Sequence, residues 1–286
     1  MKLLRYGPQG KEKPGLLDAD GRIRDLSGKV NDIAPAVLAP DRLQALKNLK
    51  PETLPLVEGV TRFGPPVTGV GMIHAIGYNY ADHVSETKAK APEEPLVFTK
   101  AITCLTGPTD PVVMPKGSTQ TDWEVELAVV IGRKGLYVSE KDALDYVAGY
   151  AIMDDVSERH FQKNRGGQFI KGKSFDSFGP LGPWLVTRDE IPDPQKLNLW
   201  QDVNGKRCQN SNTKYMIFGV AKLISHLSEF LTLMPGDIIT TGTPSGVGLG
   251  MNPPQYLKAG DTLKLSVEGL GEQTHKVVRW EDTQKK

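Results

Sequence analysis

The chain of 286 residues carries 35 lysines and arginines against 34 aspartates and glutamates, which gives a formal net charge of +1. It has no dense basic stretch with interleaved aromatic residues, and no apolar run near the roughly 18 residues of a membrane span, which argues against nucleic-acid and membrane partners. Its N-terminus lacks an apolar signal core, and Cys104 and Cys208 lack the spacing of a disulfide framework or a zinc site. These features predict a soluble, cytoplasmic protein.

Residues 1–70 predict a small N-terminal α/β domain and its linker. Residues 2–7 and 13–27 are typical of a short hairpin, with an Asp-Gly turn at Asp20 and Gly21. Residues 41–49 are typical of a short helix, and a proline-rich connector follows over residues 50–67.

Residues 71–286 form the predicted second domain, which is rich in strands. It opens with a strand from Gly71 that runs into a helix starting near Asn79. Further strands are predicted over residues 96–99, 124–131, 146–153, 184–186, 197–203, 237–241 and 263–267, and helices over residues 140–146 and 216–231. The 30 glycines and 21 prolines are typical of β-rich folds with long loops, so an α+β, β-rich class is expected.

Glu124 and Glu126 precede the aliphatic run 127–131, which is typical of a strand buried on both faces. Side chains alternate along a strand, so the two carboxylates point the same way and Val125 points the other way. Two like charges this close destabilise a strand unless a cation or an arginine lies between them. The alternative is a solvated strand end, where neither carboxylate has a function.

Asp154 and Asp155 follow a second apolar strand, where they could meet the two glutamates. Three carboxylates without a cysteine or a nearby histidine pair suit a hard cation such as Mg²⁺. For either aspartate alone, a helix N-cap is an equally good interpretation.

Three further stretches have residues that could carry chemistry. His83 and Glu86 are spaced i, i+3, which places them on one helix face and allows a general base, although a solvated surface pair has the same spacing. Lys173 lies in a loop rich in glycine and phenylalanine and could bind a substrate carboxylate or oxyanion, or face solvent. Residues 238–250 lack the ending of a phosphate loop; Thr243 there could donate its hydroxyl to a ligand, or the segment is a plain turn.

Seven motifs resemble, in this order, those of the fumarylacetoacetate hydrolase family, over roughly residues 71–280. They are "GYNYADH", "EPLVFTK", "EVELAVVIG", "AGYAIMDDVSER", "KSFDSFGPLGPW", "VNGKRCQNSNTKYMIF" and "MPGDIITTGTPSGVG". The resemblance implies a mixed β-sandwich roll as the catalytic domain, a divalent metal (Mg²⁺ or Mn²⁺) and a homodimer.

The resemblance also implies roles for individual residues. The metal ligands are Glu124, Glu126 and, of the two aspartates, Asp155. His83 and Glu86 form a water-activating dyad on a lid that orders when substrate binds, and Lys173 joins them as a catalytic residue. Positions that hold substrate or structure the site are Tyr78, Lys100, Arg159, Gln162 and Thr243. Two departures are Tyr78, where acylpyruvases often have arginine, and His160, where an acid often follows the arginine.

The N-terminal "MKLLRYG" and "RDLS" motifs resemble a bacterial subgroup linked to hydrolysis of 2,4-diketo-3-deoxy sugar acids. This implies cleavage of the C3–C4 bond of a 2,4-dioxo acid to pyruvate and a hydroxy acid. An acylpyruvase or fumarylpyruvate-type hydrolase, an oxaloacetate decarboxylase, and a ureidoglycolate lyase remain as alternatives; a non-catalytic metal-binding protein is disfavoured by the dyad. The polar lid region, residues 85–94, favours a hydroxylated substrate, or is simply the solvated face of the lid.

Overall fold

The structure is a computed structural model that describes residues 1–60 and 62–284. The predicted connector 50–67 and the predicted second domain 71–286 therefore include residues 61, 285 and 286, which lie outside the described residues. Within the described ranges, no helix combines the length and the apolar character needed to cross a membrane.

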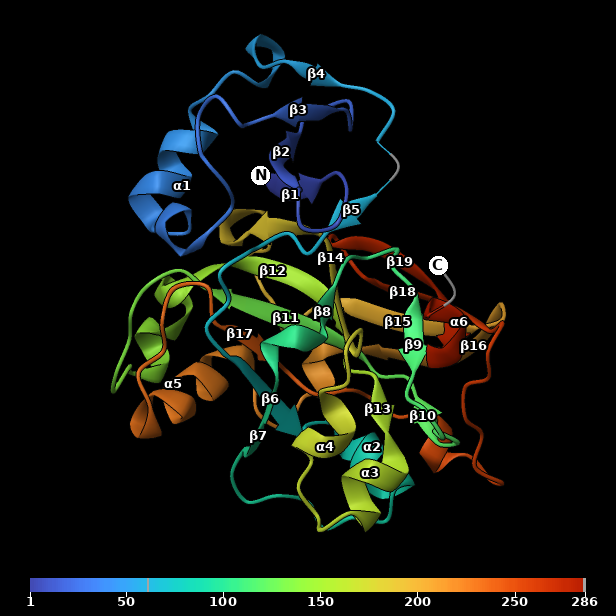
Figure 1. Cartoon of the computed structure of the whole chain (residues 1–286). Helices are drawn as coiled ribbons and strands as arrows, with labels where there is room; N and C mark the ends of the chain where they lie inside the picture. Colours follow the sequence, from blue (N-terminus) through green and yellow to red (C-terminus); the bar gives the residue numbers. More distant parts are fainter. Residues whose placement is uncertain (61, 285–286) are drawn as a thin grey trace.

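A large mixed sheet runs through the molecule (Figure 1). In spatial order its strands are β4 (Leu56–Val57), β3 (Ile23–Asp25), β2 (Lys13–Leu17), β1 (Lys2–Tyr6), β14 (Gly179–Thr187), β12 (Val147–Asp154), β11 (Val125–Ile131), β17 (Ile238–Thr240), β6 (Ile73–Gly77) and β7 (Leu96–Lys100). Two short strands join its side, β5 (Phe63–Gly64) on β1 and β8 (Leu105–Thr106) on β14. Every residue of β11 is buried, because one hydrophobic cluster takes Ala128 and Val130 and another takes Val125, Leu127 and Val129.

A second sheet packs against β11 and β12, which makes the fold a β-sandwich. Its strands, in spatial order, are β16 (Lys206–Asn212), β15 (Asn198–Val203), β18 (Thr262–Val267), β19 (Gly271–Arg279) and β9 (Val112–Met114). Leu199 and Leu265 from this sheet share a buried cluster with Val129 and Ile152 of the large sheet. Burying apolar side chains between the sheets is the main stabilising contribution of such a fold. The expected α+β, β-rich class with a mixed β-sandwich is confirmed.

Helices cover the ends and edges of the sheets. They are α1 (Pro40–Lys47), α2 (Ala81–Glu86), α3 (Arg159–Asn164), α4 (Ile170–Lys173), α5 (Val220–Phe230) and α6 (Trp280–Thr283), and β10 (Thr121–Asp122) pairs with β13 (Ser157–Glu158) beside α3. Figure 1 shows α2, α3 and α4 together at the end of the molecule opposite the N-terminal segment. These three short helices surround the end of β11 at which Glu124 lies.

The N-terminal segment is joined to the rest of the molecule through its strands and its helix. β1 pairs with β14, and Leu3 and Leu43 belong to the same buried cluster as Val130 and Leu185. The hairpin with its Asp-Gly turn is the β2–β3 pair, in which Asp18 donates its amide to the carbonyl of Arg22. A domain boundary at residue 70 stays a prediction.

Three expectations about the elements need correction. The predicted helix 216–231 begins later, at Val220, because Thr213–Tyr215 form a 3-10 turn and Gly219 is the N-cap. The predicted helix 140–146 is a 3-10 helix, and the predicted strand 184–186 is the end of the longer β14. The sequence interpretation missed β16 and β19. For β16 the signal was present, because the Asn204–Gly205 pair, which has positive φ angles of 53° and 77°, is a strong hairpin signal and joins β15 to β16.

Candidate active site

Three carboxylates meet where β11 and β12 run side by side. The strands are antiparallel with Val125 opposite Asp154, so Glu124 before β11 lies beside Asp155 after β12, whose amide donates to the Glu124 carbonyl at 2.9 Å. Because side chains alternate along β11, Glu126 points to the same side as Glu124. One oxygen from each of Glu124, Glu126 and Asp155 lies within 4.8 Å of the other two, and all three residues are buried.

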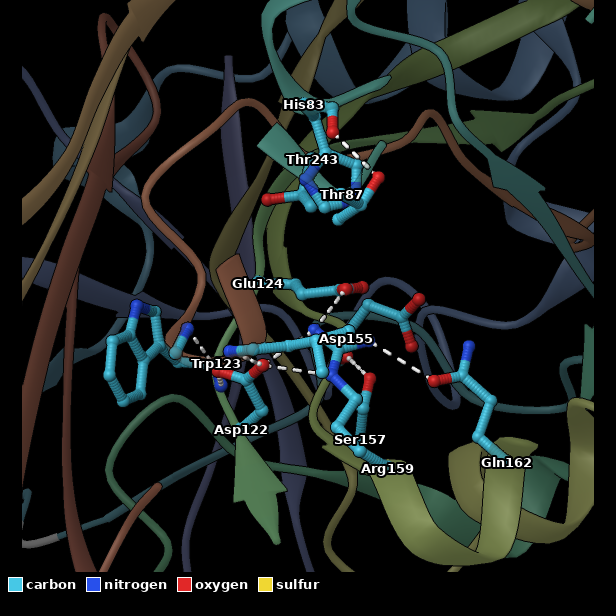
Figure 2. Close-up of polar contacts among 12 residues, drawn as sticks. His83, Thr87, Asp122, Trp123, Glu124, Asp155, Ser157, Arg159, Gln162 and Thr243 are labelled. Carbon is cyan, nitrogen blue, oxygen red and sulfur yellow. Dashed lines mark hydrogen bonds and ion pairs between the residues drawn. The ribbon is translucent and has the colours of Figure 1, made fainter. Parts of the chain in front are cut away.

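Three cations surround two of these carboxylates. The Lys173 ammonium lies 2.5 Å from Glu124 Oε2 and 2.6 Å from Asp155 Oδ2, and Lys100 lies 2.5 Å from Asp155 Oδ1. Arg159 donates to Glu124 Oε1 at 2.7 Å (Figure 2). Burial alone would raise the pKa of Glu124, but Arg159 and Lys173 outweigh it and hold that pKa well below its usual range. These two cations therefore favour the charged form of the Glu124 carboxylate.

Glu126 has a different environment. Its Oε2 accepts hydrogen bonds from the Thr240 hydroxyl and, at 2.8 Å, from the Gly242 amide, but among the described residues it has no ion-pair partner. Burial, together with the charges of Asp155 and Glu124, raises the pKa of Glu126 well above its usual range. Among the described residues, Glu126 is thus the carboxylate of the cluster that contacts no cation.

The donor set fits a hard divalent cation. Three carboxylate oxygens, without sulfur or imidazole donors, are the ligands that Mg²⁺ and Mn²⁺ prefer. A cation among them would also supply the positive charge that Glu126 lacks. The residues present therefore fit the metal that the sequence resemblance implies.

The two adjacent aspartates face different surroundings. Asp154 accepts the Glu124 amide at 2.8 Å and the Gln201 side-chain amide at 2.7 Å, and is not part of the carboxylate cluster. Burial raises the pKa of Asp154 to about 7. Asp155 faces the glutamates, as the resemblance implied, and Asp154 ties β11 to the second sheet.

His83 and Glu86 lie on α2, and Figure 2 shows His83 and Thr243 above Glu124 and Asp155. The His83 Nδ1 atom is 3.3 Å from Glu86 Oε2, and the Glu86 Oε1 atom accepts the Gly246 amide at 2.9 Å. The pair is therefore connected to the loop that follows β17, and is not a solvated surface pair. His83 is buried and lines the same pocket as Glu124, Glu126 and Asp155.

The contacts of loop 242–250 account for its small residues. The Thr243 hydroxyl donates to the Val125 carbonyl at 2.9 Å and accepts the Gln209 side-chain amide at 2.8 Å. A Cβ at Gly250 would lie 2.2 Å from the Glu86 carboxyl carbon, so only glycine leaves room for that side chain. Gly246 has a φ of 102°, which favours glycine, and a Cβ there would lie 2.0 Å from the Cys208 carbonyl oxygen. The loop is thus built to hold the dyad and the end of β11.

Most of the predicted site residues line one pocket. Those at its wall are Tyr78, His83, Glu124, Glu126, Asp155, Arg159, Gln162, Lys173 and Thr243, while Glu86 and Lys100 stand behind it in contact with His83 and Asp155. A wider cleft of about 560 Å³ between α1 and β12 holds none of these residues, and its two aspartates pair with Arg188 and Lys47. The carboxylate pocket is therefore the candidate active site.

Asp122 is a site residue that the sequence interpretation missed. It is fully buried, accepts Arg159 Nε at 2.8 Å, and accepts the amides of Gly248 and Leu249 at 2.7 and 2.9 Å. It thereby orients Arg159 toward Glu124 (Figure 2). The signal was present, because the alternation of Glu124 and Glu126 extends back by two residues to Asp122.

Comparison with known proteins identifies the family of the chain. The family described as "Fumarylacetoacetate (FAA) hydrolase C-terminal" matches residues 72–278. The chain belongs to the fumarylacetoacetate hydrolase family. A curated family relative from Burkholderia multivorans is 60% identical over 274 residues, which cover 96% of this chain and 97% of that protein. Its name assigns it provisionally to the hydrolases and states no substrate.

Two solved structures from the fumarylacetoacetate hydrolase family are similar over almost the whole chain. The fumarylacetoacetate hydrolase of Exiguobacterium antarcticum has a TM-score of 0.85 at 34% identity, covering 98% of this chain and 99% of that one. The maleylpyruvate hydrolase of Sphingobium sp. SYK-6, in complex with manganese(II) and pyruvate, has a TM-score of 0.81 at 28% identity with the same coverage.

Proposed function

We propose that this protein is a metal-dependent hydrolase that cleaves the C3–C4 bond of a 2,4-dioxo acid, giving pyruvate and a second acid. The observation that carries the proposal is the placement of the Glu124, Glu126 and Asp155 cluster and His83 on the walls of one pocket. The similar maleylpyruvate hydrolase, whose structure contains manganese(II) and pyruvate, supports it.

A divalent cation, Mg²⁺ or Mn²⁺, would be held by Glu124, Glu126 and Asp155. When bound, it would act as a Lewis acid toward the oxygen atoms of a 2-oxo acid. The Lys173 ammonium, which contacts Glu124 and Asp155, adds positive charge next to the position where an enolate oxygen develops. Arg159 and Gln162, which are hydrogen-bonded to each other at 3.2 Å, are assigned to substrate positioning.

In this proposal His83 is the general base. Its Nδ1 faces Glu86, so the other ring nitrogen, Nε2, takes the proton from a water molecule. The water oxygen adds to C4, the C3–C4 bonding pair stays on C3 as the enolate of pyruvate, and C3 then takes up a proton. The fragment that contained C4 leaves as a carboxylic acid.

For the substrate itself, we propose a 2,4-diketo-3-deoxy sugar acid. This rests on the resemblance of the N-terminal motifs to the sugar-acid subgroup and on the charged, polar lid region, residues 85–94. In that region Lys88, Lys90, Glu93 and Glu94 are exposed, and no large apolar side chain is present to hold an alkyl or aromatic tail.

A substrate panel tests the proposed function. The purified protein is treated with a chelator, reloaded with Mg²⁺ or Mn²⁺, and given a diketo-deoxy sugar acid, acetylpyruvate, fumarylacetoacetate, oxaloacetate or ureidoglycolate. We expect turnover of the dioxo acids only after reloading. The product measured is pyruvate or, for fumarylacetoacetate, acetoacetate. A kcat/KM more than tenfold higher for oxaloacetate or ureidoglycolate than for the dioxo acids would show that the proposed reaction class is wrong. Full activity in metal-free protein would show that the reaction needs no cation.

A further inference from the structure

Tyr78 has a backbone conformation that is unusual for its residue type. Its φ is 54°, in the left-handed region, where a residue with a Cβ is disfavoured by roughly 1–2 kcal/mol. It lies between the last residue of β6, Gly77, and Asn79. Residues held in such conformations cluster at functional sites, because the surrounding structure must enforce them.

Asn79 is the residue that enforces this turn. It is fully buried, and its side-chain amide donates to the carbonyls of Thr241 and Phe218 at 2.7 and 3.0 Å. Its side-chain oxygen accepts the Phe218 amide at 2.8 Å. Three hydrogen bonds to two other segments thus fix the residue after Tyr78, and the chain reaches Asn79 from β6 through the left-handed turn.

The turn places the Tyr78 ring against His83. The two ring centroids are 6.0 Å apart and the planes differ by 24°, an offset stacked arrangement. Glu86 holds the edge of the imidazole at Nδ1, and Tyr78 packs along its face. Because α2 has six residues, it provides little rigidity by itself, and these two contacts limit how His83 can rotate.

We propose that Tyr78 is a positioning residue for His83, and that its aromatic ring, and not its hydroxyl, performs this role. The inference rests on the proposed role of His83 as the base, and it replaces the substrate contact expected at Tyr78 from the family resemblance. Among the described residues the Tyr78 hydroxyl has no hydrogen-bond partner, whereas its ring has a defined one. The strained turn delivers the ring to the imidazole.

Two substitutions distinguish the contribution of the Tyr78 ring from those of its backbone conformation and its hydroxyl. Tyr78→Phe keeps the ring and removes the hydroxyl, and Tyr78→Asn removes the ring while tolerating the left-handed turn. Both variants are assayed with the dioxo acid that the protein turns over best. We expect the kcat of Tyr78→Phe to stay within about 3-fold of that of the unsubstituted protein. Tyr78→Asn should lower kcat by roughly 10–100-fold, the effect of a misplaced catalytic group, with KM changed by less than about 3-fold. Thermal unfolding of both variants verifies that they fold.

An NMR measurement tests the contact without any substrate. In protein labelled at histidine carbons, the His83 ring signals are assigned by their loss in His83→Gln. They should move downfield in Tyr78→Asn, because a stacked ring shields them, and stay in place in Tyr78→Phe. A failure of the proposed function would leave this result unchanged.

Three outcomes would overturn the inference. If Tyr78→Asn leaves both kcat and the His83 signals unchanged, the ring does not position His83. If Tyr78→Phe lowers kcat as much as Tyr78→Asn, the hydroxyl is required. If Tyr78→Phe instead raises KM more than tenfold, Tyr78 is a substrate contact.

Discussion

Asp154 and Asp155 are neighbours in the chain, but they differ in what a substitution should do. Asp155 contacts two lysines beside the two glutamates, whereas Asp154 contacts the Glu124 amide and Gln201. A strand reverses its side-chain direction at each residue, so one carboxylate faces the pocket and the other faces the second sheet. At the scale of the residue, this reversal decides which aspartate can be a metal ligand.

We expect Asp155→Asn to weaken Mn²⁺ binding by more than the roughly 10–100-fold that is lost when a residue supporting a metal ligand is removed. Asp154→Asn should bind Mn²⁺ almost as well as the unsubstituted protein. In the described part of the chain the Gln201 amide oxygen has no hydrogen-bond partner, so Gln201 can turn to accept a hydrogen bond from the new asparagine. Calorimetric titration measures both affinities, and equal losses in the two variants would contradict the assignment of Asp155.

His83→Gln should lower hydrolysis of a dioxo acid by about 10²–10⁴-fold, the contribution of a general base. Decarboxylation of oxaloacetate, where the protein shows it, should fall much less, because that reaction needs no activated water. The two rates are measured on the same preparation. Equal losses would mean that His83 binds substrate and does not activate water.

The next scale is the element, and α2 is the element on which the dyad depends. Two hydrogen bonds connect α2 to loop 242–250: Ser245 donates to Asp82 at 2.8 Å, and the Gly246 amide donates to Glu86. Just before α2, Asn79 is hydrogen-bonded to Thr241 and Phe218, and the Tyr78 ring stacks on His83. A six-residue helix held mainly by such contacts can open without unfolding the sheets.

Ser245→Ala should favour an open α2. A hydrogen bond contributes about 0.5–1.5 kcal/mol, which corresponds to roughly 2–10-fold in the equilibrium between closed and open states. Tryptic cleavage after Lys88 and Lys90 should accelerate by that factor. Ser85→Ala, also on α2 but with an exposed side chain, is the control and should be cleaved at the original rate. Equal rates for both variants would show that Ser245 does not hold the helix.

At the scale of the whole molecule, the N-terminal segment and the sandwich share a buried cluster. Leu43 on α1 is 6% exposed and belongs to the same cluster as Val130 on β11. The four tryptophans, in contrast, are Trp123, Trp184, Trp200 and Trp280, all outside the first 70 residues. Their fluorescence therefore reports unfolding of the sandwich and, through Trp184, whose ring centroid lies 5.6 Å from the Lys2 ammonium, its contact with β1.

Leu43→Ala should destabilise the protein by about 2–5 kcal/mol, as removal of a buried leucine side chain does. Because the cluster is continuous, the tryptophan-detected midpoint of thermal unfolding should fall by several degrees. Gln44→Ala, at the adjacent exposed position, should leave the midpoint in place. A midpoint unaffected by Leu43→Ala would show that the N-terminal segment unfolds independently.

We also expect the protein to be a homodimer, as the family resemblance implies. Light scattering after size-exclusion chromatography should give twice the chain mass of 31.3 kDa. The measurement is repeated over a hundredfold dilution, because a weak dimer dissociates on dilution and a stable one does not. The mass of a single chain at every concentration would contradict the expectation.

Much of this protein was determined by local features of the sequence. Alternation along residues 124–131 places Glu124 and Glu126 on one side of a buried strand, and the spacing of His83 and Glu86 places both on one turn of helix. The turn chemistry at Asp20–Gly21 determines a hairpin. Side-chain periodicity and backbone preferences act over a few residues, so such features can be read directly from the chain.

Other features were decided only by the tertiary structure. The pairing of β11 with β12 brings Glu124 next to Asp155. Lys173, on α4 and 18 residues after Asp155 in the chain, contacts both carboxylates. The left-handed turn at Tyr78 exists because Asn79 is held by Thr241 and Phe218, which are more than 130 residues away in the chain. No local preference encodes these contacts, because each depends on the free energy of burying and pairing groups from segments that meet only when the two sheets close.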